Sequence, residues 1–282
     1  MPARALLNGG PAPEAAFQDR ACQFGDGLFE TLAVRNGEPC LWSLHMARLL
    51  EGCFRLDIPP SDPGLLLREA RSLCGGQVRG VLKIIVSAGE SMRGYARPDD
   101  PSPNRWLHCG NWPEGAPWAE PEQGLQLHAC SMRLGSQPRL AGIKHLNRLE
   151  QVLARRELPP GSHEGVMRDQ QDRVVEGISS NILLMQDDCY LTPALDQCGV
   201  AGTVRQLLID SADTLDLPLR VGQVEWQALL DARAVFMMNS LMGIRPVAGL
   251  GTHAYPVGAR SAPLERLHKA CFTFAGDTEC NA

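Results

Sequence analysis

The sequence predicts a mixed α/β protein with two domains. Strands and helices alternate along the first hundred residues, and a chain of 282 residues is long enough for two domains that each bury a core. The segment 112–124, WPEGAPWAEPEQG, is rich in Pro, Gly and Glu, which is typical of a connector. We therefore expect a small N-terminal α/β domain over residues 1–115 and a larger C-terminal domain over residues 116–282.

The N-terminal half begins with a predicted hairpin. The stretch 27–41, GLFETLAVRNGEPCL, has two apolar segments around an Asn36-Gly37 pair, which is the strongest short hairpin signal. A helix is expected over residues 43–56, SLHMARLLEGCFRL. Its expected buried stripe consists of Leu44, Leu49, Leu50, Cys53, Phe54 and Leu56.

Further elements follow from the same patterns. The stretch 61–75 predicts a second helix, and the β-branched residues of 78–89 predict a strand. Additional strands are expected at 105–111, 125–132, 164–169, within 173–185 and at the start of 231–247, with a turn at 239–243. A helix with a glycine at its start is expected over 200–215.

Residues 141–158, AGIKHLNRLEQVLARREL, predict an amphipathic helix. Leu146, Leu149 and Leu153 fall on one face, as expected for a helix packed on a core. Lys144 would then lie at the helix entrance, where the helix dipole disfavours a cation. This position indicates a functional role for Lys144, and the alternative is a solvated surface lysine.

The composition excludes several classes of function. A net charge of -5, the absence of a long basic run and an aromatic content of 5% argue against a nucleic-acid-binding protein. The chain begins without a basic-then-apolar signal segment, and no apolar run approaches the length of a membrane span, so we expect no membrane partner. Ten scattered cysteines without a C-x-x-C pair and dispersed histidines predict reduced thiols in the cytoplasm and no metal site.

Three isolated features could bind a phosphate or serve catalysis. Backbone N–H groups of Thr203 and Val204, at the start of the helix after Gly202, are suited to a phosphate. Arg48 could give a forked contact to the same group, and Glu176 in a predicted strand is a carboxylate that would need a partner if buried. The alternatives are an ordinary glycine before a helix, a surface arginine and a strand-end surface charge.

Taken in order, these motifs resemble a known family. GIKHLNRLEQVLAR, VVEGISSNI, GVAGTVRQ, and FGDGLFETLAV followed by HMARL are similar to motifs of the fold type IV pyridoxal-phosphate enzymes. This family includes branched-chain and D-amino-acid aminotransferases and the aminodeoxychorismate lyases, and KHLNRLEQ, GVAGTVRQ and NSLMGIRPV look most like the lyases. The resemblance implies a D-amino-acid aminotransferase-like fold with a barrel-like sheet in the C-terminal domain, and a homodimer.

The resemblance also implies roles for the cofactor-binding residues. Lys144 matches the lysine that forms a Schiff base with pyridoxal 5'-phosphate and acts as general acid and base. Glu176 matches the carboxylate that keeps the pyridine nitrogen protonated. Four residues match those that bind the cofactor phosphate: Arg48, Thr203, Val204 and Ser240. Arg148, expected one helical turn beyond Lys144, matches a residue that contacts the ring oxygen.

The substrate contacts implied by the resemblance are Phe29, Arg93 and Tyr95. Arg93 matches an arginine that binds a substrate carboxylate in related transaminases, and Tyr95 would assist it. Phe29 stands where D-amino-acid transaminases have a tyrosine, so it cannot supply a hydroxyl to their carboxylate-binding site. Ala33 stands where some lyases have an arginine.

Three functions are therefore compared. The first is a lyase that converts the small molecule 4-amino-4-deoxychorismate to 4-aminobenzoate and pyruvate, a step of folate biosynthesis. The second is an aminotransferase with the same cofactor, acting on D-amino or branched-chain amino acids. The third is a non-catalytic α/β protein in which Lys144 and Glu176 are structural charges.

Overall fold

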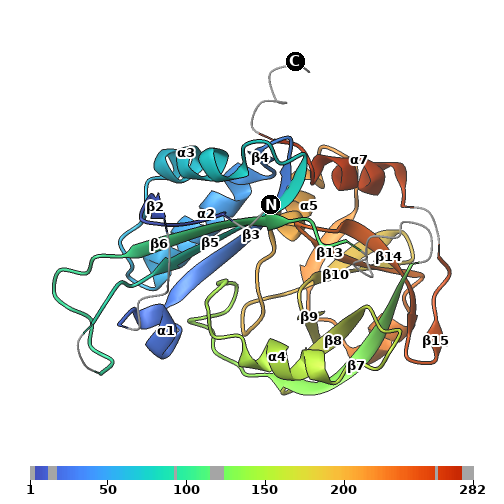
Figure 1. The fold of residues 1–282 in the computed structure, drawn as a ribbon. Helices are drawn as coiled ribbons and strands as arrows, with labels where there is room; N and C mark the ends of the chain where they lie inside the picture. Colours follow the sequence, from blue (N-terminus) through green and yellow to red (C-terminus); the bar gives the residue numbers. More distant parts are fainter. Residues whose placement is uncertain (1–3, 12–17, 92–93, 115–123, 258–259, 275–282) are drawn as a thin grey trace. The chain divides into compact units, whose positions relative to one another are not determined.

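The structure, a computed structural model, describes residues 4–11, 18–91, 94–114, 124–257 and 260–274. The chain divides into two compact units, each with its own sheet and its own core (Figure 1). The first unit comprises Met1–Pro113, Ile143–Asn147 and Phe272–Ala282. The second unit comprises Glu114–Gly142 and Arg148–Cys271. The segment that contains Lys144 therefore belongs to the first unit.

The first unit is built on a six-stranded antiparallel sheet with the order β2-β1-β6-β5-β3-β4. At the predicted hairpin, Asn36 and Gly37 both have positive φ, 50° and 83°, which confirms the Asn-Gly turn. The strands are β1 (Arg4–Leu7), β2 (Gly10–Pro11), β3 (Gly27–Arg35), β4 (Glu38–Pro39), β5 (Arg79–Ser87) and β6 (Asn104–Asn111).

Three helices accompany this sheet: α1 (Arg20–Phe24), α2 (Trp42–Arg55) and α3 (Pro63–Cys74). The Asp62 carboxylate accepts hydrogen bonds from the N–H groups of Gly64 and Leu65, which caps α3 and explains why the helix begins at Pro63. The stripe expected on α2 was wrong at Phe54, which is 82% exposed. The helix instead buries the face that contains His45, Met46 and Leu49.

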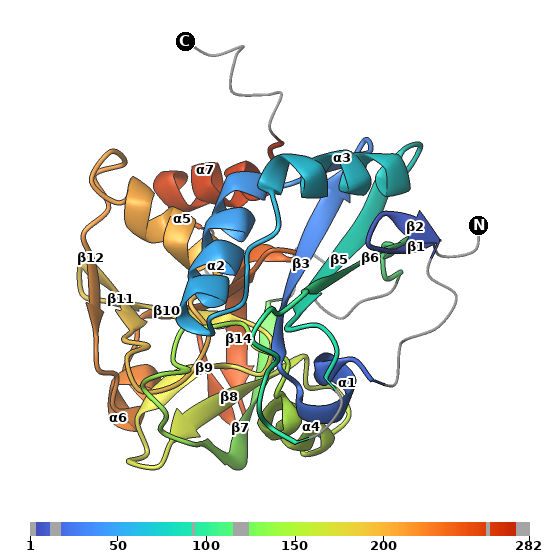
Figure 2. The same cartoon turned by 90° about the vertical axis from the view of Figure 1, so that its left-hand side faces the viewer.

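Both long helices of the first unit lie on the same face of the sheet (Figure 2). Every second residue of β3 and β5 points into one hydrophobic core, which also receives the buried sides of α2 and α3. The core strand residues are Leu28, Leu32, Val34, Leu82, Ile84 and Val86. Alternation in β3 also places Glu30, between Leu28 and Leu32, on the buried face.

The second unit is built on a curled nine-stranded sheet with the order β12-β11-β10-β13-β14-β7-β8-β9, with β15 added beside β14. The N–H of Val174 in β9 donates to the carbonyl of Val224, just after β12, at 2.8 Å. This bond joins the two ends of the strand order, so the expected barrel-like sheet is confirmed. The strands are β7 (Leu125–Leu134), β8 (Glu164–Asp169), β9 (Val174–Gly177), β10 (Asn181–Gln186), β11 (Cys189–Pro193), β12 (Leu219–Gly222), β13 (Ala234–Asn239), β14 (Gly243–Leu250) and β15 (His253–Ala254).

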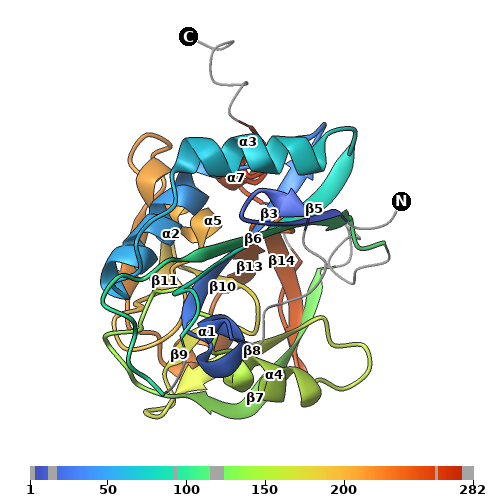
Figure 3. The same cartoon turned by 60° about the vertical axis from the view of Figure 1, so that its left-hand side comes forward.

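The helices of the second unit are α4 (Leu149–Arg156), α5 (Thr203–Ser211), α6 (Trp226–Leu230) and α7 (Ala262–Ala270). Helix α4 packs on β7 and β8 through the buried Ala154 (Figure 3). The stripe expected on this helix was wrong, because Leu149 is 76% exposed and Leu153 is 46% exposed. In the part of the chain that the structure describes, no helix is both long and apolar enough to cross a membrane.

Candidate active site

Lys144 lies on an extended segment beside β3. The N–H of Phe29 donates to the carbonyl of Lys144 at 3.0 Å, and the N–H of Leu146 donates to the carbonyl of Gly27 at 3.0 Å. Because these groups pair with a strand, they cannot join a helix, and α4 begins only at Leu149. The expectation that Lys144 lies at the helix entrance was therefore wrong.

Arg148 is the N-cap residue of α4, with φ −125° and ψ 27°. The extended segment before it means that Arg148 does not lie one helical turn beyond Lys144, as the sequence had suggested. Its predicted contact with the cofactor ring cannot be argued from helical spacing.

The amine of Lys144 lies over the ring of Phe29. The Nζ atom is 4.3 Å from the ring centroid, within the range of a cation–π contact. The same residue therefore fixes Lys144 twice, through its backbone N–H and through its side chain. Phe29 was predicted to contact substrate, and its position beside Lys144 is compatible with that role.

Arg48 is held by a buried carboxylate that the sequence analysis did not single out. Its Nε donates to Glu30 Oε1 at 2.8 Å, and its Nη2 contacts Glu30 Oε2. His45 Nδ1 lies 2.6 Å from Glu30 Oε2, and Glu30 is only 1% exposed. Arg48 and His45 are three residues apart on α2, so both side chains can reach the same carboxylate on β3.

The protonation states of Glu30 and His45 follow from their burial and from the groups around them. Burial alone would raise the pKa of the Glu30 carboxyl, but the charge of Arg48 and the hydrogen bonds from Arg48 and His45 hold the pKa below its ordinary value. Burial lowers the pKa of His45 below its ordinary value, although Glu30 opposes this shift. At neutral pH, Glu30 is therefore ionised, and a neutral His45 donates to it through Nδ1–H.

A pattern in the sequence could have indicated Glu30. A carboxylate that falls at the buried phase of an apolar strand needs a partner, and His45 and Arg48 share one face of the next helix. The pairing itself is a contact between elements, which periodicity alone cannot identify.

In the second unit, Glu176 is 4% exposed on β9, as expected for a buried carboxylate with a partner. Its Oε2 accepts the N–H of Val200 at 2.8 Å. The carbonyl of the same residue accepts Asn181 Nδ2 at 2.9 Å, so both sides of Val200 are fixed. Asn181 lies within the motif VVEGISSNI but was not among the predicted site residues.

The loop fixed by these bonds leads into α5. Gly202 is the N-cap residue and provides no side chain to the helix N–H groups, while Thr203 and Val204 form a buried first turn. A Cβ atom on Gly202 would lie 2.0 Å from Asn181 Oδ1. The predicted helix with a glycine at its start is confirmed, and a helix N-terminus is the kind of group that binds phosphate.

Ser240 lies in the turn between β13 and β14. The preceding Asn239 shapes this turn, because its Oδ1 accepts the N–H groups of Leu241 and Met242, each at 2.9 Å. Asn239 Nδ2 also donates to the carbonyl of Ser179 at 3.1 Å, which ties the turn to the segment after Glu176.

Of the predicted substrate contacts, Arg93 lies outside the described residues. Tyr95 is 85% exposed, and its carbonyl accepts a hydrogen bond from Arg20 Nη2 at 2.8 Å. Arg20 also donates to the carbonyl of Ala96 and pairs with Asp26. The backbone near Tyr95 is thus anchored while its side chain faces solvent.

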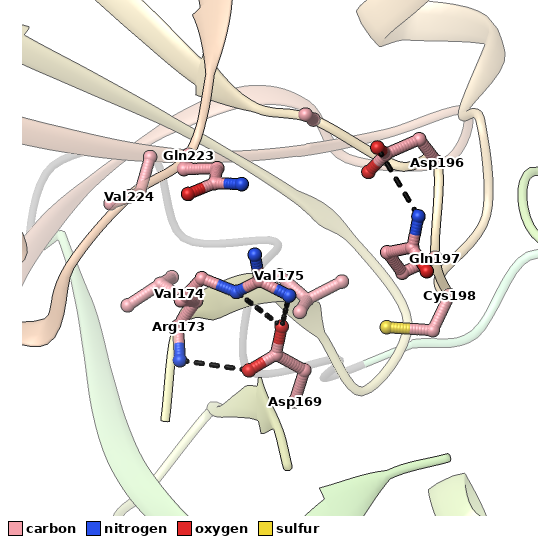
Figure 4. Close-up of a pocket in the computed structure, with 10 residues that line it drawn as sticks. Asp169, Arg173, Val174, Val175, Asp196, Gln197, Cys198, Gln223 and Val224 are labelled. Atoms are coloured by element: carbon pink, nitrogen blue, oxygen red, sulfur yellow. Dashed lines mark hydrogen bonds and ion pairs between the residues drawn. The ribbon is translucent and has the colours of Figure 1, made fainter. Parts of the chain in front are cut away.

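The cavity in Figure 4 is a different feature of the second unit. It is bordered by a closed polar pair, in which Asp169 accepts from both Nε and N–H of Arg173, at 2.7 and 2.9 Å. No predicted site residue lines it, so it is not the expected binding site. The lining residues are Asp169, Arg173, Val174, Val175, Ala194, Asp196, Gln197, Cys198, Gln223 and Val224.

The donor groups of each unit fit pyridoxal phosphate. The first unit supplies a primary amine on Lys144 and a guanidinium held in place on Arg48. The second supplies the buried carboxylate of Glu176 and, at Gly202, a helix start where a side chain would not fit. These are the groups required by an aldehyde, a phosphate and a protonated pyridine nitrogen.

Comparison with known proteins agrees with this set of groups. The chain belongs to the amino-transferase class IV family, whose sequence profile matches residues 27–250. It is similar to the aminodeoxychorismate lyase of Vibrio harveyi, with 33% identity over 92% of this chain and 97% of that protein. A crystal structure of 4-amino-4-deoxychorismate lyase from Pseudomonas aeruginosa is 46% identical, with a TM-score of 0.85 over 94% of this chain and 97% of the other.

The fold is shared more widely. A hypothetical aminotransferase from Mycobacterium tuberculosis, in its PLP-bound form, has a TM-score of 0.79 over 95% of this chain and 97% of the other, with 22% identity. At this identity the likeness concerns the fold alone.

Proposed function

We propose that this protein is a pyridoxal-phosphate-dependent lyase that converts 4-amino-4-deoxychorismate to 4-aminobenzoate and pyruvate. The observation that carries the proposal is the similarity to two such lyases over at least nine-tenths of each chain. The Lys144 amine beside Phe29 and the buried Glu176 supply the chemistry that such a lyase needs.

The cofactor contacts are proposed as follows. Lys144 Nζ binds the aldehyde carbon, Glu176 holds the proton of the pyridine nitrogen, and Arg148 contacts the ring oxygen. The phosphate is bound by the guanidinium of Arg48, by the N–H groups at the start of α5 and by the hydroxyl of Ser240. The N–H groups are those of Thr203 and Val204.

The chemistry requires one base and one set of anion contacts. When bound, pyridoxal phosphate supplies an electron-withdrawing ring that stabilises negative charge on the carbon bearing the substrate amine. Lys144 Nζ accepts the proton from that carbon. Expulsion of the enolpyruvyl oxygen then makes the substrate ring aromatic, and one proton added to the enolpyruvyl methylene gives pyruvate. Arg93 and Tyr95 would bind a substrate carboxylate.

The atoms of the two products account for the whole substrate, so the reaction consumes neither water nor a keto acid. An aminotransferase, by contrast, needs a keto acid to accept the amine. Phe29 favours the lyase, because its ring cannot offer the hydroxyl that a transaminase tyrosine would give to a carboxylate.

The test is to mix the purified protein with aminodeoxychorismate in the absence of any keto acid and to follow both products. We expect equal amounts of 4-aminobenzoate and pyruvate. A Lys144→Ala variant should form neither, because the base and the cofactor attachment are lost together.

Two other outcomes would reject the lyase. A borohydride-reducible absorption band with no products would indicate an aminotransferase, which amine transfer from D-amino or branched-chain amino acids would identify. Absence of any such band after incubation with pyridoxal phosphate would indicate a non-catalytic protein.

The proposed assembly is a homodimer. Helix α4 exposes an apolar face, formed by Leu149, Val152 and Leu153. Pairing of α4 with its copy in a second chain would bury this face, because a two-fold contact brings the same apolar residues of both chains together.

The proposed location is the cytoplasm. Nine cysteines in the described part of the chain are present as thiols, and most are buried. Thiols of this number are typical of a reducing compartment.

A further inference from the structure

Glu30 lies between the two predicted cofactor-binding residues of the first unit, Arg48 and Lys144. Its carboxylate binds the guanidinium of Arg48, while the residue before it, Phe29, binds the backbone and contacts the amine of Lys144. Two neighbouring residues of β3 thus hold both groups. Glu30 is almost fully buried, so its contacts are not exchanged for water.

The contact with Arg48 constrains direction as well as distance. Glu30 uses both carboxylate oxygens against Nε and Nη2 of one guanidinium edge. A bidentate contact fixes the plane of the guanidinium, and therefore the direction in which its remaining edge points. His45 fixes the carboxylate in turn, with Nδ1 at 2.6 Å from Oε2.

We propose that Glu30 is a positioning residue for cofactor binding, which acts by orienting Arg48 toward the phosphate of pyridoxal phosphate. This inference rests on the proposed function, because it assumes that Arg48 binds the phosphate. Glu30 does not contact the cofactor in this proposal.

Charge and orientation predict opposite effects, which makes the proposal testable. Glu30 is an anion near a group that binds a phosphate, so by charge alone its removal should strengthen phosphate binding. If Glu30 orients Arg48, its removal should weaken phosphate binding although the site becomes more positive. In Glu30→Gln the amide NH2 cannot accept from Arg48 or His45, so at least one donor loses its partner.

The first unit offers a matched control. Glu69 on α3 is also buried and holds Arg105 on β6, through Nε at 3.0 Å and Nη2 at 2.6 Å. Glu69→Gln makes the same chemical change in a Glu–Arg pair of the same sheet, at a residue without a proposed role in cofactor binding.

The experiment measures the Kd of pyridoxal phosphate and of pyridoxal, which lacks the phosphate, by titration of the cofactor absorption band. We expect Glu30→Gln to raise the Kd for pyridoxal phosphate by about tenfold or more and to leave the Kd for pyridoxal within about twofold. Glu69→Gln should change neither value by more than about twofold.

A second variant tests whether Glu30 acts through Arg48. Arg48→Lys keeps the charge but loses the fork, so it should also weaken binding of pyridoxal phosphate. If Glu30 acts only through this guanidinium, the Glu30→Gln/Arg48→Lys double variant should bind no more than about twofold more weakly than Arg48→Lys alone. Full additivity of the two effects would overturn the proposal.

Three further results would overturn the proposal while leaving the proposed function in place. They are an unchanged or lower Kd for pyridoxal phosphate in Glu30→Gln, equal weakening of both ligands, and equal effects of Glu30→Gln and Glu69→Gln. If Glu30→Gln is not folded by circular dichroism, Glu30→Asp, which keeps the charge with a shorter reach, replaces it under the same criteria. Failure of the wild type to bind pyridoxal phosphate would instead reject the proposed function.

Discussion

At the scale of single residues, burial gives two ordinary carboxylates specific partners. Glu176 is buried with one oxygen on the N–H of Val200, and Glu30 is buried against Arg48 and His45. A carboxylate in either place needs a fixed partner, because an unpaired buried charge is costly. These partners determine what each carboxylate can do: Glu30 is committed to an arginine, whereas Glu176 is proposed to hold the pyridine proton.

Replacement of Glu176 by Gln tests its proposed role at the pyridine nitrogen. The amide oxygen can still accept the N–H of Val200, so the fold should persist, but an amide cannot keep the pyridine nitrogen protonated. We expect kcat for release of 4-aminobenzoate to fall by about 100-fold or more, with pyridoxal phosphate still bound. A variant with wild-type kcat would contradict the assignment, and the absorption spectrum serves as the control for cofactor content.

A second prediction at this scale concerns pH. Burial, together with the charges of Arg260 and Arg245, lowers the pKa of His268 to about 4, and the N–H of Ile244 donates to its Nδ1 at 3.1 Å. Because the unfolded chain binds this proton first, near pH 6.5, the contribution of His268 is complete above that pH and is lost as the pH falls toward 4.

We expect the free energy of unfolding to fall by about 2 kcal/mol from this group between pH 6.5 and 4. Urea unfolding at several pH values measures it. His268→Gln, which can still accept from Ile244, should remove this part of the slope. The same slope in wild type and variant would show that other groups cause the acid loss.

At the scale of elements, the start of α5 depends on a glycine and on the loop before it. Gly202 is followed by two buried residues, and Asn181 occupies the space where a Cβ would lie. The loop is further fixed by the N–H of Gly142, which donates to the carbonyl of Gly199 at 2.9 Å. The position of the helix start is thereby fixed, which suits binding of an anion at a helix N-terminus.

Gly202→Ala should therefore weaken cofactor binding. The added methyl group would force Asn181 or the helix start to move, and we expect the Kd for pyridoxal phosphate to rise by about tenfold. Gly64→Ala in the first turn of α3 is the matched control, because its Cβ would meet nothing closer than 3.5 Å. Equal Kd values for wild type and Gly202→Ala would remove α5 from the proposed phosphate contacts.

At the scale of the whole molecule, each unit closes its own core and leaves some apolar surface uncovered. The first unit packs two helices on one face of a sheet, and the second closes its sheet between Val174 and Val224. Helix α4 nevertheless exposes three apolar residues at helical spacing, which neither core requires. An apolar stripe of this kind is typical of a surface that meets another chain.

A Leu149→Glu/Leu153→Glu variant tests the proposed dimer. Charges on the face of α4 should convert the dimer to a monomer, because like charges would oppose each other across the symmetric contact. Sedimentation equilibrium or light scattering measures the mass. Val221→Glu, at another exposed apolar position, is the control. A dimer that survives the α4 changes would place the interface elsewhere.

Elements with local signals could be predicted from the amino-acid sequence alone. The Asn36-Gly37 turn follows from two adjacent residues, and α5 begins immediately after Gly202. The family motifs also predicted that Lys144 and Glu176 bind the cofactor, because a motif can be recognised from the order of residues along the chain. The surroundings of Lys144, by contrast, could not be predicted in this way.

The setting of Lys144 depends on contacts between distant segments. Its carbonyl pairs with Phe29 of β3, which turns an expected helix entrance into an extended strand-like segment. In the same way, the pairing of Glu30 with Arg48 joins β3 to α2. A periodicity reports which face of an element is buried, but not which partner that face meets, since the partner is brought there by the folding of the rest of the chain.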